Sequence, residues 1–320
     1  MNAAAVAAAV VQAAHDLRPY VQQTPLVGSP WLGKALGADV RLKLENVQDT
    51  GSFKLRGATN ALLRQPPDRL QRGVVAASSG NHGLGVATAA QRLQVPATVF
   101  VPNGALPQKV AAIADCGAEV LRFGDDCVDT ERHARRIAAA SGRHYVSPYN
   151  DPDVIAGQGS VAVELLAQWP EVEVVYVAVG GGGLIGGMAA HAKSLRPGVE
   201  FVACSPRASP ALAECVRQGR IVDVPCGETL SDSTAGGVEP GAITFPLCQQ
   251  LVDRYLDVDE AAIEQALLAM LRQQHLLVEG AAAVAVAACL QDPGLAGRRA
   301  AIVVCGGNLP LSVLQRLLAR

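Results

Sequence analysis

The stretch Thr50-Gly51-Ser52-Phe53-Lys54-Leu55-Arg56-Gly57-Ala58 places one lysine among small, apolar and glycine-flanked residues, just before a predicted helix. Where water is scarce, an ammonium group loses its proton easily, because desolvation disfavours the charged form. The neutral amine is a nucleophile, and lysines that form Schiff bases are activated in this way. The alternative is a solvated lysine at a helix start, the common setting for this residue type. The rest of the chain decides between the two.

The composition is typical of helices packed on buried strands. Of the 320 residues, 50% are hydrophobic, 18% are charged and 4% are aromatic, and the length suits two domains. The apolar residues are mainly Ala, Val and Leu, as in parallel sheets covered by helices. The net charge is −2 and no basic stripe is present, which argues against a nucleic-acid partner.

The cysteines and the apolar segments bear on the compartment. The eight cysteines form no C-x-x-C pair, and the histidines do not complete a zinc spacing. Free buried thiols in a reducing cytoplasm are therefore expected. The Ala-rich start, Ala3 to Val11, lacks a basic region before it and predicts an amphipathic helix, not a signal peptide. The run Gly280 to Leu290 is too short to cross a bilayer, so we expect a cytoplasmic protein with no membrane partner.

Short apolar runs alternate with helical patterns along most of the chain, which predicts parallel sheets covered on both faces. One series lies between Gly73 and Ala140, and a second between Val161 and Val304. Two turn-rich or polar stretches, Gln65-Pro66-Pro67-Asp68 and Tyr145 to Asp153, are predicted boundaries. Residues 221–245 are predicted to be irregular.

The loop Gly180 to Leu184 follows a predicted strand, at the end of a sheet where ligands of open α/β folds bind. Its glycines let the backbone approach an anion, and the following helix directs free N–H groups at it, so we expect a phosphate. Gly181, Gly183 and Gly186 also fit a dinucleotide pattern. That pattern requires an acidic residue at the end of the next strand, which here reads Ala203-Cys204-Ser205.

Two further loops lie at predicted strand ends. Ser78-Ser79-Gly80-Asn81-His82-Gly83 offers hydroxyl, amide and N–H groups suited to a carboxylate or a phenolic oxygen, and its alternative is a polar helix cap. Cys305-Gly306-Gly307-Asn308 could direct a weak S–H donor at a ring nitrogen. The alternative is a buried cysteine that ends a core strand.

Taken together, these four stretches resemble the fold-type II pyridoxal-phosphate enzymes, within the serine/threonine dehydratase (threonine ammonia-lyase) and serine racemase group. Their order and spacing cover nearly the whole chain. The resemblance implies a tryptophan synthase β-like α/β fold in which two domains each hold a mostly parallel sheet covered by helices. Residues 1–66 and 151–320 would form a large cofactor-binding domain and residues 67–150 a small mobile domain, in a homodimer.

The resemblance also implies the site residues. Lys54 would hold pyridoxal 5′-phosphate as a Schiff base and take the substrate α-proton, and Ser79 lies where racemases carry a second acid/base. The implied cofactor-binding set is Phe53, Lys54, Asn81, Gly180, Gly181, Gly182, Gly183, Leu184, Gly237, Glu279 and Cys305. The implied substrate-carboxylate set is Ser78, Ser79, Asn81 and His82. For Glu279 the alternative is a charge at a helix N-terminus.

The implied reaction is β-elimination from a hydroxy amino acid, which yields a 2-oxo acid and ammonia. An amino-acid racemase or a β-replacement synthase of the same fold, a nucleotide-binding oxidoreductase and a non-catalytic cofactor-binding protein are the alternatives. Racemase-like members hold a divalent cation where this chain has Ser205, Ser209 and Ala211, so no metal site is expected. The segment Asp232 to Phe245 is similar to the hydroxyectoine-utilisation dehydratases. Serine, threonine, a 3-hydroxyaspartate, a phenylserine or a hydroxyectoine-derived compound stay open as substrates.

Overall fold

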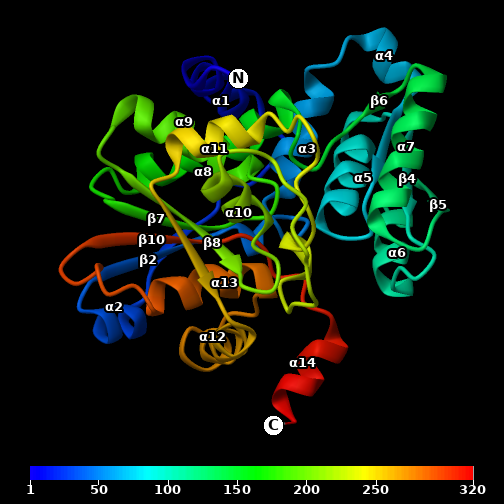
Figure 1. The fold of residues 1–320 in the computed structure, drawn as a ribbon. Helices are drawn as coiled ribbons and strands as arrows, with labels where there is room; N and C mark the ends of the chain where they lie inside the picture. The colour runs from blue at the N-terminus through cyan, green and yellow to red at the C-terminus, as the bar shows by residue number, and fades with distance from the viewer. Residues whose placement is uncertain (320) are drawn as a thin grey trace.

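A computed structural model describes residues 1–319, which fold around two sheets (Figure 1). The six-stranded sheet has the order β1-β2-β10-β7-β8-β9, and the four-stranded sheet has the order β5-β4-β3-β6. The elements in chain order are α1 (Ala3–Asp16), β1 (Leu26–Gly28), α2 (Pro30–Leu36), β2 (Asp39–Leu44), η1 (Glu45–Val47), α3 (Lys54–Leu63), α4 (Pro67–Arg72), β3 (Val74–Ala77), α5 (Asn81–Leu93), β4 (Ala97–Val101), α6 (Pro107–Ala114), β5 (Glu119–Arg122), α7 (Cys127–Ser141), β6 (His144–Tyr145), α8 (Pro152–Gln168), β7 (Val174–Ala178), α9 (Gly183–Leu195), β8 (Glu200–Pro206), α10 (Ala211–Gln218), η2 (Asp232–Thr234), α11 (Thr244–Leu251), β9 (Arg254–Val258), α12 (Glu260–Gln273), α13 (Gly280–Leu290), β10 (Arg299–Val304) and α14 (Leu311–Leu318).

The six-stranded sheet is parallel except for its edge strand β1, which pairs antiparallel with β2. Its central strand β7 is buried at every residue, as its continuous Val-rich run predicts. Helices α1, α8, α9 and α11 lie on one face, and α2, α12 and α13 lie on the other (Figure 1). Helix α13 consists mainly of alanine and is buried from Gly280 to Cys289, because small side chains let it lie close to the sheet. The predicted fold class is confirmed.

The four-stranded sheet is parallel throughout, and its strands lie between residues 74 and 145. Helix α3 belongs to the core of this part as well: Leu55, Ala58 and Leu62 share one buried apolar cluster with strands β3 and β4. Lys54, the first residue of α3, therefore lies at the junction between the parts of the protein built on the two sheets.

The structure corrects several predicted boundaries. The first helix ends at Asp16, not near Tyr20, and α8 begins at Pro152, although its pattern predicts a helix only from Val161. The cause is local: Asp151 caps α8 and Pro152 occupies its first turn, where a missing N–H does no harm.

Glycines in the first half of α8 also obscure its pattern, since glycine disfavours a helix interior. They are needed for packing. A Cβ on Gly157 would lie 2.6 Å from the Arg56 carbonyl oxygen, and one on Gly159 would lie 2.9 Å from the Gly187 carbonyl oxygen. The segment Gln65 to Asp68, predicted as a turn, contains the start of α4 at Pro67. Strands β1, β6 and β9 and helices α2 and α14 are additional to the predicted elements.

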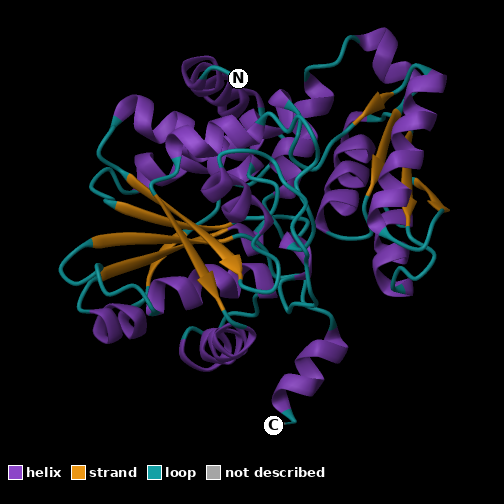
Figure 2. Ribbon diagram, in the orientation of Figure 1, coloured by secondary structure: helices purple, strands orange, loops and turns teal. Residues whose placement is uncertain are grey.

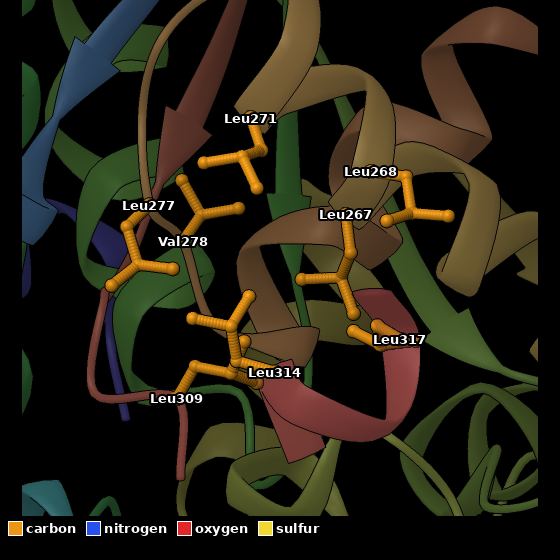
Figure 3. A pocket seen from close by; sticks show the side chains of 8 residues that line it. All are labelled: Leu267, Leu268, Leu271, Leu277, Val278, Leu309, Leu314 and Leu317. Atoms are coloured by element: carbon orange, nitrogen blue, oxygen red, sulfur yellow. The ribbon is translucent and has the colours of Figure 1, made fainter. Parts of the chain in front are cut away.

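Two further observations concern the described chain outside the predicted site residues. Among residues 1–319, no helix combines the length and the apolar character needed to cross a membrane. A cavity of about 10 Å³ lies between α12, α14 and residues 277–278 (Figure 3). Leucines and one valine line it, so it holds no group that can carry out chemistry.

Candidate active site

Loops gather between the two sheets (Figure 2). Most of the predicted site residues come from loops that follow β3, β7 and β10 and from the start of α3, whereas Glu279 directly precedes α13 and Gly237 lies between η2 and α11. The first and the last of the four stretches meet directly. Ser52 and Gly306 form an isolated antiparallel bridge, and the Phe53 N–H donates to the Cys305 carbonyl at 3.1 Å. The chain thus brings residues from its two ends to one side of Lys54.

Lys54 is the first residue of α3, and its Nζ donates a hydrogen bond to the Pro148 carbonyl oxygen at 2.9 Å. Burial lowers the pKa of this amine to about 8, and the nearby Cys305 and Glu279 only partly oppose that shift. A neutral amine is therefore accessible near physiological pH, as the sequence predicts.

Helix α3 is fixed by a buried ionic network two residues beyond Lys54. Arg56, 1% exposed, makes a bidentate pair with Glu45 at 2.7 and 2.9 Å and a second pair with Glu164 at 2.6 Å. Glu164 also accepts from the buried Lys43 at 2.6 Å. The positive charges of Arg56 and Lys43 balance the negative charges of Glu45 and Glu164. The network therefore joins β2, α3 and α8 without burying a net charge. We assign Arg56 a positioning role for the helix that carries Lys54.

The glycine loop follows β7, and its Gly183 is the first residue of α9. Gly182 has φ +86°, which favours glycine, and no side chain caps the helix. A Cβ on Gly181 would lie 2.3 Å from the Tyr149 ring, and one on Gly182 would lie 2.8 Å from Cys248 Sγ. The loop therefore presents bare backbone N–H groups at a helix N-terminus, a ready site for a phosphate.

Thr244 gives a second sign of a missing partner at this loop. Its Oγ1 is buried without a hydrogen bond, and its Cβ is 3.4 Å from the position of a Cβ on Gly182. Buried hydroxyls are normally paired, so this atom suits an oxygen-bearing ligand beside the loop. The residues present fit the phosphate of pyridoxal phosphate.

Asn81 and Glu279 meet although 198 positions separate them in the chain. Asn81 Nδ2 lies 2.9 Å from both oxygens of Glu279, whose carboxylate also accepts from Ser233 Oγ at 2.8 Å and from the Asn308 N–H at 3.2 Å. Asn308 Nδ2 donates to Asn81 Oδ1 at 2.7 Å. Burial raises the pKa of Glu279, which is 3% exposed. Glu279 makes no capping hydrogen bond to α13, so its side chain serves this network and not the helix end.

The second loop does not cap its helix either: α5 begins after Gly80 with no side-chain cap. Ser78 Oγ accepts from the Gly80 N–H at 3.1 Å, and Ser79 is half-buried at the same strand end. Burial lowers the pKa of His82 to about 3, and its Nε2 lies 2.8 Å from the Val146 carbonyl oxygen. The neutral imidazole donates there, which leaves His82 Nδ1 as a buried acceptor and not as a donor to a carboxylate.

Cys305 directly follows β10 and is 3% exposed. Burial and the nearby Glu279 raise the pKa of its thiol well above its usual range, so the thiol stays protonated. Gly237, in contrast, lies in an exposed part of the loop between η2 and α11, and a Cβ added to it would meet nothing within 4 Å. The structure brings Lys54, Asn81, Glu279 and Cys305 together, and Gly237 makes no hydrogen bond to any of them.

Sequence reasoning missed Pro148, Tyr149 and Ser233 as members of the site. The first two lie in the stretch Tyr145 to Asp153, which predicts only a boundary, and Ser233 lies in the segment predicted as irregular. The one available signal was the polar, proline-bearing stretch Tyr145 to Asp153 itself, because binding and catalytic residues occur disproportionately in loops.

Comparison with known proteins agrees with this geometry. The family model described as pyridoxal-phosphate dependent enzyme matches residues 17–306. The chain is 40% identical to the L-threonine ammonia-lyase of Thermotoga maritima over 309 residues, which cover 97% of this chain and 77% of the relative. It is 36% identical to the L-threo-3-hydroxyaspartate ammonia-lyase of Saccharomyces cerevisiae, over 94% of this chain and 93% of the relative. The structure of maize serine racemase superposes with a TM-score of 0.92 at 30% identity, over 98% of this chain and 96% of that one.

The resemblance inferred from the four stretches is confirmed, and the nucleotide-binding oxidoreductase does not fit this match. The matched region contains Lys54, the glycine loop, Asn81 and Cys305. The chain belongs to the family of pyridoxal-phosphate-dependent enzymes.

Proposed function

We propose that this enzyme is an ammonia-lyase that removes water from a β-hydroxy amino acid and releases a 2-oxo acid and ammonia. One observation carries the proposal: Lys54, whose pKa burial lowers to about 8, lies near the buried Cys305 thiol and donates to Pro148. The next residue, Tyr149, packs on a glycine loop that presents free N–H groups. The names of the Thermotoga maritima and Saccharomyces cerevisiae relatives, both ammonia-lyases, support the reaction class.

The described residues divide the work of holding the cofactor. Pyridoxal phosphate, when bound, withdraws electrons from the substrate α-carbon through its ring. The N–H groups of Gly180 to Leu184 would hold its phosphate, with Thr244 Oγ1 beside them. Asn81 would donate to the ring 3′-oxygen, and Glu279 and Asn308 fix the orientation of its amide.

The loop Ser78 to Gly83 would contact the substrate, and Lys54 would transfer the proton. Ser78, Ser79 and the free N–H groups that begin α5 would bind the substrate carboxylate, because these donors lie at a helix N-terminus. His82 would contribute its backbone N–H, since its side chain is committed to Val146. Lys54 Nζ would take the α-proton, and movement of the part built on the four-stranded sheet would exclude water.

The Cys305 thiol would favour β-elimination over reactions that require a longer-lived negative charge at the α-carbon. A thiol that stays protonated would be only a weak donor to the ring nitrogen and, unlike a carboxylate, would not keep a proton on it. Negative charge at the α-carbon would then be poorly stabilised, and loss of the β-hydroxyl would relieve it. A Cys305→Ser variant should keep lyase activity within about threefold, because a hydroxyl is also a weak neutral donor.

A panel assay tests the reaction and the substrate together. Ammonia and 2-oxo acid release is measured on serine, threonine, 3-hydroxyaspartate, phenylserine and a hydroxyectoine-derived hydroxy amino acid, with chiral analysis of the unreacted substrate. The proposal predicts ammonia release with at least one of them. D-enantiomer formation without ammonia would favour the racemase, and product formation only with an added thiol would favour the β-replacement synthase. Ser79→Ala should lower any racemisation more than it lowers elimination.

Three finer statements belong to the same proposal. We infer a hydroxyectoine-derived substrate from the segment Asp232 to Phe245, a mobile small domain of residues 67–150, and a cytoplasmic homodimer. The substrate panel tests the first. Sedimentation of the holoenzyme tests the dimer, and small-angle scattering with and without a substrate analogue tests the movement. A monomer, or scattering that does not change, would contradict the corresponding statement.

A further inference from the structure

Tyr149 links the glycine loop to a distant segment. It follows β6 and precedes α8, directly after the carbonyl that accepts from Lys54. Its ring covers the loop so closely that a Cβ on Gly181 would lie 2.3, 2.4 and 2.5 Å from three ring carbons. Its hydroxyl oxygen accepts a hydrogen bond from the Glu239 N–H at 2.9 Å. The face of Tyr149 thus fixes the loop while its tip is held by the segment between η2 and α11.

Glu239 extends this link to the four-stranded sheet. Its carboxylate accepts from Arg135 Nη2, on α7, at 2.8 Å. Arg135 is itself oriented by Glu131 at 2.7 and 3.0 Å, and its guanidinium lies 4.3 Å from the centroid of the Tyr145 ring. An arginine held at two sides in this way loses little further freedom when it pairs with Glu239.

A second ion pair joins the same parts. Lys109 Nζ, on α6, lies 3.0 Å from Asp232 Oδ2, at the start of η2. The neighbour of Asp232, Ser233, donates to Glu279, and Thr234 lies 3.1 Å from the position of a Cβ on Gly180. The segment between Asp232 and Glu239 therefore pairs at two places with helices of the four-stranded sheet while it touches the glycine loop and the Asn81–Glu279 network.

We propose that Tyr149 is a positioning residue that couples the glycine loop to helix α7 through Glu239 and Arg135. The inference rests on the proposed role of that loop as the phosphate site. In this arrangement, displacement of α7 breaks the Arg135–Glu239 pair, frees the Glu239 backbone and loosens the ring that covers Gly181. Docking of the four-stranded part and affinity for the cofactor phosphate are then one coupled equilibrium.

Cofactor affinity of the apoprotein tests this link without recourse to turnover. Apoprotein is titrated with pyridoxal 5′-phosphate, and the Kd is measured for the wild-type chain, Tyr149→Phe, Arg135→Gln and the double variant. Tyr149→Phe keeps the ring and removes only the acceptor, so the Kd should rise about fivefold, the value of one hydrogen bond. Arg135→Gln should raise it about two- to fivefold, because the pair is partly exposed. The double variant should show no more than the larger single effect, since both changes break the same link.

Arg132→Gln is the matched control. Arg132 lies on α7 and pairs with Asp129 of the same helix at 2.9 Å, so its loss should leave the Kd unchanged. If Tyr149→Phe fails to fold by urea denaturation, Glu239→Gln replaces it, with the same expectation as Arg135→Gln.

The outcomes separate the two proposals. A wild-type chain that does not bind pyridoxal phosphate overturns the proposed function. A wild-type chain that binds, together with a Tyr149→Phe variant of unchanged Kd or with effects that multiply in the double variant, overturns only the coupling.

Discussion

Lys54 Nζ donates to the Pro148 carbonyl oxygen at 2.9 Å, across 94 positions of the chain. The partner is a neutral carbonyl and not a carboxylate, so no ion pair holds the charge on the amine. Lys43, by contrast, donates three hydrogen bonds, one of them to Glu164. This difference separates a structural lysine from one that is free to exchange its single partner for an aldehyde carbon.

The lowered pKa of Lys54 predicts how cofactor capture depends on pH. With a pKa of about 8, roughly a tenth of the amine is neutral at pH 7, against less than about one in a thousand for a lysine of pKa 10.5. The neutral fraction rises as pH rises, so the rate of capture by apoprotein should increase from pH 6 to 8 and level off near pH 9. Stopped-flow absorbance measures it. A rate that still rises about tenfold per pH unit up to pH 10 would indicate an ordinary lysine.

Gly181→Ala should damage the phosphate loop. The added Cβ would lie 2.3 Å from the Tyr149 ring, and overpacking of this kind destabilises by about 1–3 kcal/mol. We expect the Kd for pyridoxal phosphate to rise by about tenfold or more. Gly198→Ala is the control, because nothing lies within 4 Å of its Cβ. Equal affinities for the two variants would argue against a close-packed cradle at Gly181.

Glu279→Gln should destabilise the chain although the side-chain shape is kept. The carboxylate accepts from Asn81, Ser233 and Asn308, and a glutamine amide would direct N–H groups at one or more of these donors. A buried group left unpaired costs about 1–3 kcal/mol. Urea denaturation measures the loss, with the exposed Glu228→Gln as control. An unchanged midpoint for Glu279→Gln would mean that the network does not hold Asn81.

What could be predicted from the sequence follows from how local each signal is. The glycine loop and the Lys54 stretch are contiguous, so their backbone chemistry is readable before the fold is known. The Asn81–Glu279 contact spans 198 positions, and the Tyr149–Glu239 contact spans 90. Hydrophobic periodicity along the sequence does not show which distant residues will form a contact. Likewise, α8 is only half predicted, because glycines needed for packing against α3 and α9 weaken its helical pattern.

The role of Lys54 is the central claim, and borohydride reduction of the holoenzyme tests it most directly. Reduction fixes the cofactor to the amine that holds it, and peptide mass spectrometry then locates it. Lys34→Ala, an exposed lysine, should behave as the wild-type chain, with the label on Lys54. Lys54→Ala should carry no label, lose the visible absorbance of lysine-bound cofactor on dialysis and release no ammonia above background. A label on another lysine, or a Lys54→Ala variant that keeps both absorbance and full turnover, would contradict the account.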